Sequence, residues 1–275
     1  MKSRAQGPGL RDQGQKFQVI AAIALATILV STGAANAGSP GDPARRCDAS
    51  TTQIEEFSEP QALRVGDAGG LRVNPTDSKA FDEMLHGDHA TPLRWDRVPE
   101  LVVLMPVMQY EKGRGTQYRA TAQQLSAEEA DALVADLTRA ISVLTDGVFQ
   151  GFAAVHREAA TAGDVVNVMR PGQIVVARYD GVREQLSTIG FGGRSTRSDL
   201  IRAGSIILDN DFDRTSTLRR LLRTHELGHA LGYNHVHSRA SIMNPKIGPE
   251  PNDFDRAVAR VAFQDFERRE ATSCS

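Results

Sequence analysis

HELGHALGYNH, residues 225–235, carries the clearest pattern of residues in this sequence. On a helix, His225 and His229 lie on one face, about 6 Å apart along the axis, so both imidazoles can reach one metal ion. Gly232 favours the end of a helix, because glycine adopts the left-handed conformation at little cost. The chain can then turn back and bring His235 to the same ion. The stretch therefore predicts a helix that ends at this glycine and a metal site with three histidine ligands.

Three imidazole ligands predict a catalytic zinc ion rather than a structural one. Three neutral histidines leave the fourth position of tetrahedral Zn2+ open to water or substrate. Glu226 follows the first ligand directly, so we expect its carboxylate to act on that water without binding the metal. The alternative is a buried helix whose histidines satisfy local hydrogen bonds, but this alternative leaves their joint spacing unexplained.

The extended pattern resembles the signature of the metzincin metalloproteases. A second motif, SIMNP at residues 241–245, is similar to the Met-turn of that group, and Met243 follows His235 by eight residues, a spacing similar to that of the matrixin branch. The resemblance implies an α+β catalytic domain with a twisted mixed sheet, three main helices, and a zinc cleft between an upper and a small lower subdomain. It also implies that Met243 forms an apolar floor beneath the metal; the alternative is an ordinary core methionine.

Two features depart from the matrixin pattern. Cys47 lies in the context Arg-Arg-Cys-Asp, which does not match a cysteine-switch sequence. Val236 stands where matrixins commonly carry a serine after the third histidine. The resemblance to this branch therefore rests on the two motifs and their spacing.

The resemblance implies a zinc-dependent endopeptidase that acts on protein or peptide substrates. Glu226 would take a proton from a zinc-activated water and deliver it to the leaving amine. Extended substrate would pair with an edge strand, expected at Ser205–Asp209, and residues 244–247 would wall the pocket beyond the scissile bond. The alternative is a zinc-binding envelope protein that keeps the fold and does not cleave, although such a protein has no need of Glu226.

The start of the chain is typical of an export signal. Basic residues precede the apolar run Phe17–Val30, and Ala35–Ala37 has the small-x-small pattern of a cleavage site. The run is too short to span a bilayer comfortably. We therefore expect a signal peptide at residues 1–37, a secreted or periplasmic protein, and no stable membrane anchor after cleavage; an uncleaved signal anchor is the alternative.

Export would place the two cysteines in an oxidising compartment, where disulfides form. Cys47 and Cys274 lie near the two ends of the mature chain, so a disulfide between them would join its ends. In a second interpretation, the Cys47 thiolate caps the metal in an inactive precursor. In a third, both cysteines are free buried thiols.

Composition and charge limit the classes of protein that fit. The chain has 275 residues, 40% of them hydrophobic, and a formal charge of −2, which excludes collagen-like and disordered chains and gives no basic patch for nucleic acid. Residues 38–95 are rich in Gly, Pro, Asp and Ser and predict an N-terminal extension or pro-region. Residues 96–275 are then the catalytic domain. The oligomeric state is left open.

Local patterns predict several strands. Glu100–Gln109 is typical of a strand in which Pro106 indicates an edge position or a bulge. Shorter strands are expected at Val165–Met169, Gln173–Tyr179 and Ser205–Leu208. Because these strands alternate with helices, we expect an α+β or α/β sandwich.

Capping signals predict the main helices. Ser126–Glu129 forms a capping box, and apolar residues follow it at helical spacing. Thr215 or Thr217 is expected to cap the helix that runs through Leu231, and a last helix is expected to start at Asn252.

Three other polar clusters have both a ligand-binding and a structural interpretation. Asp209, Asp211 and Asp213 alternate as calcium ligands often do, or they form an acidic capping loop. The pair of histidines in His86–His89 could bind a structural metal, or it lies in a surface loop. His237 is either a substrate-side group or a solvated loop residue.

Overall fold

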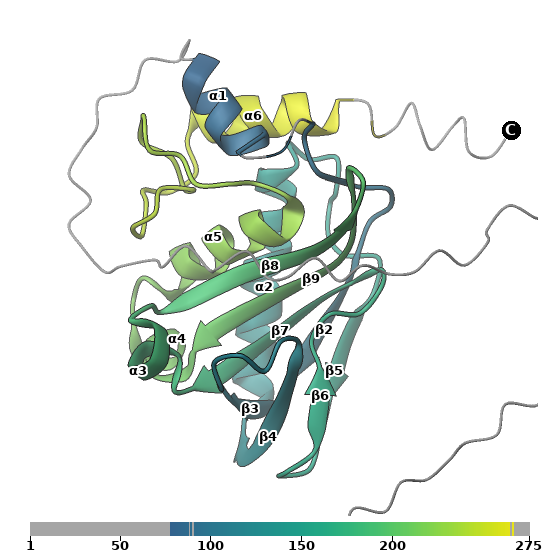
Figure 1. The fold of residues 1–275 in the computed structure, drawn as a ribbon, viewed down its shortest axis with the longest axis vertical. Coiled ribbons are helices and arrows are strands. Elements are labelled where there is room, and N and C mark those ends of the chain that lie inside the picture. The colour runs from purple at the N-terminus through teal and green to yellow at the C-terminus, as the bar shows by residue number, and fades with distance from the viewer. Residues whose placement is uncertain (1–77, 88, 90, 265, 267–275) are drawn as a thin grey trace, which may run out of the picture. The chain divides into compact units, whose positions relative to one another are not determined.

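The computed structural model describes residues 78–87, 89, 91–264 and 266. The predicted signal peptide at 1–37, residues 38–77 of the predicted extension, and the predicted disulfide between Cys47 and Cys274 lie outside the described residues. The described part is α+β, with a mixed sheet and several helices (Figure 1). The coarse fold class predicted from the sequence is confirmed.

The helices, in chain order, are α1 (Ser78–Leu85), α2 (Ala127–Leu144), α3 (Val182–Leu186), α4 (Asn210–Thr215), α5 (Arg219–Leu231) and α6 (Asp253–Phe263). The longest are α2, α5 and α6, with 18, 13 and 11 residues. None of the helices in the described part of the chain combines the length and the apolar character that crossing a bilayer requires.

The strands, in chain order, are β1 (Arg94–Trp95), β2 (Glu100–Leu104), β3 (Pro106–Gln109), β4 (Gln117–Gln124), β5 (Val155–Glu158), β6 (Val165–Asn167), β7 (Gln173–Asp180), β8 (Gly190–Arg197) and β9 (Leu200–Asp209). Strand β7 organises the sheet, because β2, β3 and β9 all pair with it in parallel. Strands β4 and β8 run antiparallel to β3 and β9.

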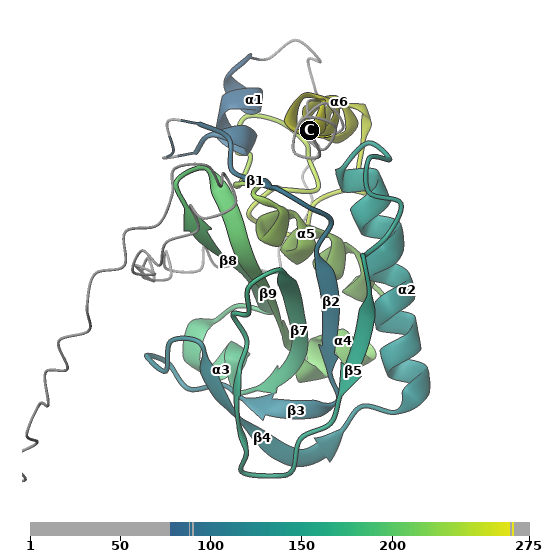
Figure 2. The same cartoon turned by 90° about the vertical axis from the view of Figure 1, so that its right-hand side faces the viewer.

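Helices α2 and α5 lie on the same side of this sheet (Figure 2). The main hydrophobic core lies between them and the sheet. Its fully buried members include Leu133, Leu137, Val176, Ile206, Leu222 and Leu227. This packing holds the helix that carries the HELGHALGYNH motif against the sheet.

Helix α2 begins where the capping box predicts. The backbone N–H of Glu129 donates to Ser126 Oγ at 3.1 Å, and the backbone N–H of Ser126 donates to the Glu129 carboxylate at 2.8 Å. Leu133, Leu137 and Ile141, which recur at helical spacing, are buried on one face. The helix and its buried face are therefore confirmed.

The predicted strand Glu100–Gln109 is interrupted. It forms β2 and β3, and the pairing of β3 with β4 shifts in register between Pro106 and Met108. Because β3 has a partner on each side, Pro106 marks a bulge and not an edge. The strands expected at Val165–Met169 and Gln173–Tyr179 correspond to β6 and β7.

The prediction of an edge strand at Ser205–Asp209 is wrong. These residues belong to β9, which lies between β7 and β8; Ser205 is paired with Val175 on one side and Gly193 on the other. Within the described residues, β8 pairs with β9 alone and forms the edge.

Strand β8 escaped prediction because its sequence, GFGGRSTR, lacks the apolar alternation of a strand. Two of its glycines lie against α5. A Cβ on Gly192 would lie 2.2 Å from the backbone oxygen of Glu226 and 2.7 Å from the Cβ of His229. The glycines therefore allow the strand to approach the helix closely, a need that the local sequence pattern does not reveal.

The start of α5 also differs from the prediction. Neither Thr215 nor Thr217 caps it, because α5 begins at Arg219 and the residue before it makes no side-chain cap. A separate short helix, α4, precedes it. Asp209 caps α4 by accepting the backbone N–H of Phe212 at 2.9 Å.

The described residues between 78 and 95 belong to the predicted extension, yet they pack into the domain. Ala80, Met84 and Trp95 are buried in the main core, and β1 pairs in parallel with β9. The packed domain therefore begins before residue 96.

Candidate metal centre

Three histidine side chains converge where α5 ends and the following loop begins. The Nε2 atoms of His225, His229 and His235 lie 3.1–3.2 Å from one another. A tetrahedral zinc ion with nitrogen ligands at about 2.0–2.1 Å separates those nitrogens by roughly 3.3 Å. Among the residues that the structure describes, this is the only group of three or more His, Cys, Asp or Glu side chains arranged to hold a metal ion. The structure thus brings the predicted ligands together.

Hydrogen bonds to the other ring nitrogens fix the tautomers. His225 Nδ1 lies 2.7 Å from the carbonyl oxygen of Ile242, and His229 Nδ1 lies 2.9 Å from that of Tyr233. A carbonyl oxygen only accepts, so each Nδ1 donates its proton and each Nε2 presents a lone pair. Lone pairs that face one another at this distance repel, and a cation between them removes the repulsion. The donor set therefore fits zinc.

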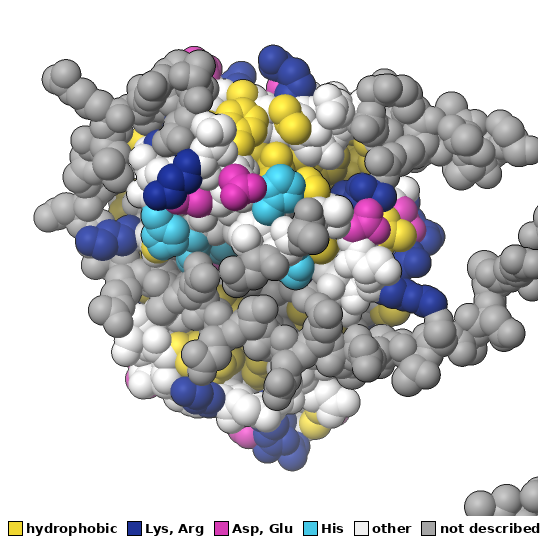
Figure 3. All heavy atoms as spheres, turned by 45° about the horizontal axis from the view of Figure 1, so that its top comes forward, with side chains coloured by type: hydrophobic (Ala, Val, Ile, Leu, Met, Phe, Trp, Pro, Cys, Tyr) yellow, Lys and Arg dark blue, Asp and Glu magenta, His cyan; other side chains and the backbone are white. Residues whose placement is uncertain are grey.

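Burial keeps the three rings neutral. It lowers the pKa of His225 to about 4, and burial together with the nearby His225 and His237 lowers the pKa of His235 to about 3. Burial also lowers the pKa of His229 well below its usual value. Neutral imidazole is the form that binds metal. His229 remains partly exposed, and Figure 3 shows histidine side chains reaching the surface of one face.

Glu226 is a buried carboxylate without a partner. It is 1% exposed, and neither carboxylate oxygen makes a hydrogen bond of good geometry with the described protein atoms. Burial raises its pKa well above the usual value, and the nearby Gly192 amide opposes only part of that shift. An unpaired buried carboxylate is costly to a fold, so its presence one residue after the first ligand indicates a role in chemistry.

Met243 packs against the same helix. Its side chain is fully buried, and a Cβ on Gly228 would lie 2.4 Å from its sulfur. The backbone N–H of Val236 donates to the carbonyl oxygen of Met243 at 2.9 Å, which ties this turn to the residue after the third histidine. The position of Met243 agrees with an apolar support beside the ligands.

Asp255 on α6 holds that turn, and the sequence analysis assigned it no such role. Its buried carboxylate accepts from Ser241 Oγ at 2.5 Å, from the backbone N–H of Ile242 at 3.2 Å, and from that of Asn252 at 2.8 Å. The carbonyl of Ile242 in turn orients His225. The Asn252–Asp255 capping box, which starts α6 as predicted for Asn252, is the sequence signal that marks this carboxylate.

Gly232 ends α5 as predicted. Its φ is 112°, and its backbone N–H donates to the carbonyl oxygen of His229 at 3.1 Å. A Cβ here would lie 2.8 Å from the carbonyl oxygen of Leu93. Both the left-handed conformation and the close approach of this neighbouring chain require glycine.

The other predicted metal sites are not formed within the described residues. Asp213 pairs with Arg178 and Arg223, and Asp209 caps α4, so this acidic stretch has structural partners instead of a shared cation. His86 follows α1 directly, and its Nδ1 lies 2.7 Å from Asp82 Oδ1 on that helix. His237 is exposed, and its ring centroid lies 6.3 Å from that of the third ligand.

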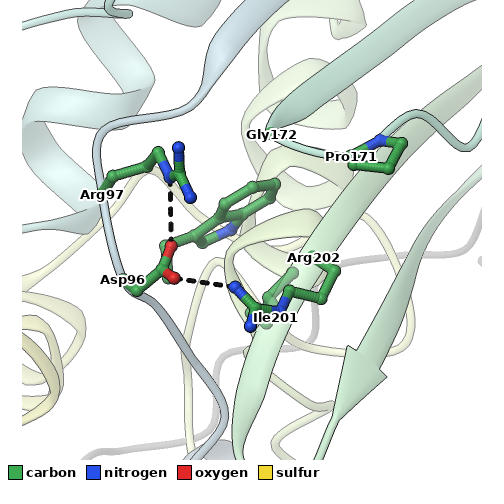
Figure 4. Close-up of a pocket in the computed structure, with 7 residues that line it drawn as sticks. Asp96, Arg97, Pro171, Gly172, Ile201 and Arg202 are labelled. Carbon is green, nitrogen blue, oxygen red and sulfur yellow. Dashed lines mark hydrogen bonds and ion pairs between the residues drawn. The ribbon is translucent and has the colours of Figure 1, made fainter. Parts of the chain in front are cut away.

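A small pocket opens away from these ligands, beside the start of β9 (Figure 4). Its volume is about 140 Å3, and it is lined by Trp95, Asp96, Arg97, Pro171, Gly172, Ile201 and Arg202. Two arginines share its carboxylate, since Asp96 lies 3.4 Å from Arg97 and 2.8 Å from Arg202. None of the three histidines lines this pocket. The pocket is therefore not part of the candidate metal centre.

Compared with known proteins, the chain matches no protein-family model, and no curated protein sequence matches it significantly. The chain's own residues and their geometry are therefore what bears on its function.

Proposed function

We propose that this protein is an exported zinc-dependent endopeptidase with a metzincin-like catalytic domain. The observation that carries the proposal is the convergence of three histidine Nε2 atoms beside a buried, unpartnered carboxylate on the same helix. A structural zinc site uses four protein ligands and gives such a carboxylate no role. Three histidines that leave one zinc position open, with one neighbouring acid, fit metal-assisted hydrolysis.

The chain's own residues divide the work of peptide hydrolysis. Zinc, when bound, would polarise the scissile carbonyl group and make a water molecule more acidic. Glu226 takes the proton as the water oxygen bonds to the carbonyl carbon, and it then donates that proton to the leaving nitrogen as the C–N bond breaks.

Strand β8 supports the proposed binding of extended substrate. It forms an edge of the sheet, and its glycines lie directly against α5 beside Glu226 and His229. A peptide added antiparallel or parallel to this edge would run past the histidine cluster. The proposed cleft then lies between the sheet with α5 and the smaller part formed by residues 233–263.

The test uses secreted protein and a casein or peptide-library substrate. Wild type should cleave, and a chelator should stop cleavage until zinc is restored. Glu226→Ala should retain zinc and lose proteolysis, because it removes the proton carrier and leaves all three ligands in place. His229→Ala should lose proteolysis and bind zinc far more weakly, and Glu128→Ala, which removes an exposed acid on α2, should change neither.

These outcomes separate the enzyme from the alternative of a non-cleaving zinc-binding protein. Wild-type protein that binds one zinc ion per chain and cleaves no substrate supports the alternative. Cleavage by Glu226→Ala at the wild-type rate contradicts the proposed mechanism.

A further inference from the structure

The loop that carries the third histidine has no helix or strand of its own, since residues 233–237 follow no regular structure. Just before His235 in the chain, this loop is held by the end of α1. The backbone N–H of Asn234 donates to the carbonyl oxygen of Met84 at 2.9 Å. The fit is close, because a Cβ on Gly87 would lie 2.8 Å from the Asn234 side chain.

Just after His235 in the chain, a single carboxylate of α1 holds the loop. Glu83 Oε2 accepts the backbone N–H of His237 at 2.9 Å, the backbone N–H of Ser238 at 3.1 Å, and the Ser238 hydroxyl at 2.9 Å. Hydrogen bonds to an ionised acceptor are stronger than those between neutral groups. The backbone on both sides of the third ligand is therefore fixed by two neighbouring residues of one helix.

Helix α1 is itself fixed to the domain. Ala80 and Met84 are fully buried in the main core. The ring of Phe81 meets that of Phe254 on α6 edge-on, with centroids 5.3 Å apart. Helix α1 is thus a rigid support for the loop, although the sequence pattern assigns it to an N-terminal extension.

We propose that Glu83 is a positioning residue of the metal centre, which sets the place of His235, and that α1 is therefore retained in the active protein. This inference rests on the proposed function. Removing a group that orients a metal ligand without binding the metal typically weakens metal affinity about 10- to 100-fold. Any cleavage that matures the chain must then lie before Ser78, since a cut after Leu85 would release the support.

The first test measures zinc affinity by competition with a chelator, using full-length secreted protein. Glu83→Ala should weaken zinc binding at least about 10-fold. Glu83→Gln should recover part of the loss, because its amide oxygen still accepts hydrogen bonds. Asp82→Asn is the matched control, since it removes an exposed carboxylate on the same helix and should leave the affinity unchanged.

A double-mutant cycle with His235→Ala separates positioning from general weakening of the fold. If Glu83 acts through His235, Glu83→Ala should cause no further loss of zinc affinity once that histidine is gone. An equal loss of zinc affinity in both backgrounds, or no loss in either, overturns the inference. The proposed function still stands in that case if the wild-type protein binds zinc and cleaves substrate. A wild-type protein that binds no zinc overturns both.

N-terminal sequencing of the active material gives a second readout. Its first residue should lie at or before Ser78. Active, zinc-loaded protein that starts after Leu85 overturns the inference.

Discussion

The two sides of helix α5 differ in how their buried charged groups are paired. On one side, Arg223 donates from Nε and Nη2 to Asp213 at 2.6 and 2.7 Å, and from Nη1 to Asp136 at 2.8 Å. Asp213 also accepts from Arg178 at 2.7 Å, and Arg178 reaches Glu129 on α2. On the other side, neither carboxylate oxygen of Glu226 makes a hydrogen bond of good geometry within the described residues, and the Nε2 atoms of His225 and His235 face each other at 3.2 Å.

These two sides show how structural polar groups can be distinguished from functional ones. The ions around Arg223 satisfy one another and join α2, α4, α5 and β7, so they need nothing from outside the chain. The buried carboxylate of Glu226 lacks such a partner within the described residues, and the proposed cation with a water or substrate would supply one. Unpaired burial, more than burial itself, therefore points to the site.

Asp213→Asn should have the largest effect on stability. The change leaves Arg178 and Arg223 buried without their shared carboxylate, which costs about 3–5 kcal/mol of unfolding free energy when one partner of a buried pair is lost. Denaturant unfolding of the variant and wild type measures it. A loss below about 1 kcal/mol would show that water replaces the carboxylate and would end the contrast between the two sides.

Gly192→Ala tests the close approach on the metal side. The new methyl group would lie 2.2 Å from the backbone oxygen of Glu226, so β8 must move away from α5 at a cost of about 1–3 kcal/mol. Peptidase activity should fall with it, because β8 borders the proposed cleft. Gly151→Ala is the control, since its methyl group meets only Thr138 at an ordinary 3.6 Å. Equal melting temperatures for the two variants contradict this account.

Glu226→Gln should change stability in the opposite direction to Asp213→Asn, although both replace a carboxylate with an amide. Removing an unpaired buried carboxylate should stabilise the zinc-free protein by about 1–2 kcal/mol. Because burial raises the pKa of this carboxyl, its cost appears above the ordinary pKa of glutamate, and the gain should grow as pH rises. Denaturant unfolding in chelator across neutral pH measures it. Destabilisation at every pH would show that Glu226 is paired after all.

The smallest effect is expected at Glu129. Burial raises its pKa, but hydrogen bonds from Ser126 and the charge of Arg178 outweigh burial and lower it to about 2. A lowered pKa contributes stability above the ordinary value for glutamate, and this contribution disappears as pH falls toward 2. Glu129→Gln should therefore lose about 1 kcal/mol near neutral pH, since the side chain is partly exposed, and little in acid. Unfolding curves from pH 7 to pH 2 should converge, and parallel curves would contradict the assignment.

Local rules explain what the sequence predicted well. The capping box at Ser126, the apolar spacing along α2, the helix end at Gly232 and the four-residue spacing of His225 and His229 depend on neighbours within about one or two turns. These elements are confirmed because nothing distant competes with them.

Contacts between distant parts of the chain explain the features that the sequence patterns did not predict. The strand at Gly190–Arg197 exists because glycine lets it lie against α5, and this displaces Ser205–Asp209 from the edge. Asp255 and Glu83 support the ligands from helices outside the motif, 13 residues after Ile242 and 154 residues before His237. No pattern in the motif itself identifies such partners, since each depends on how the whole domain closes.

The support of His225 by Asp255 has a consequence for the order of events during biosynthesis. All three ligands are synthesised before α6, so a growing chain contains every histidine before it contains the carboxylate that fixes the Ile242 turn. The ligands themselves span a short segment, but their alignment waits for a helix that is synthesised after all of them. Tight metal capture is therefore expected to follow synthesis of α6, and its onset marks docking of that helix.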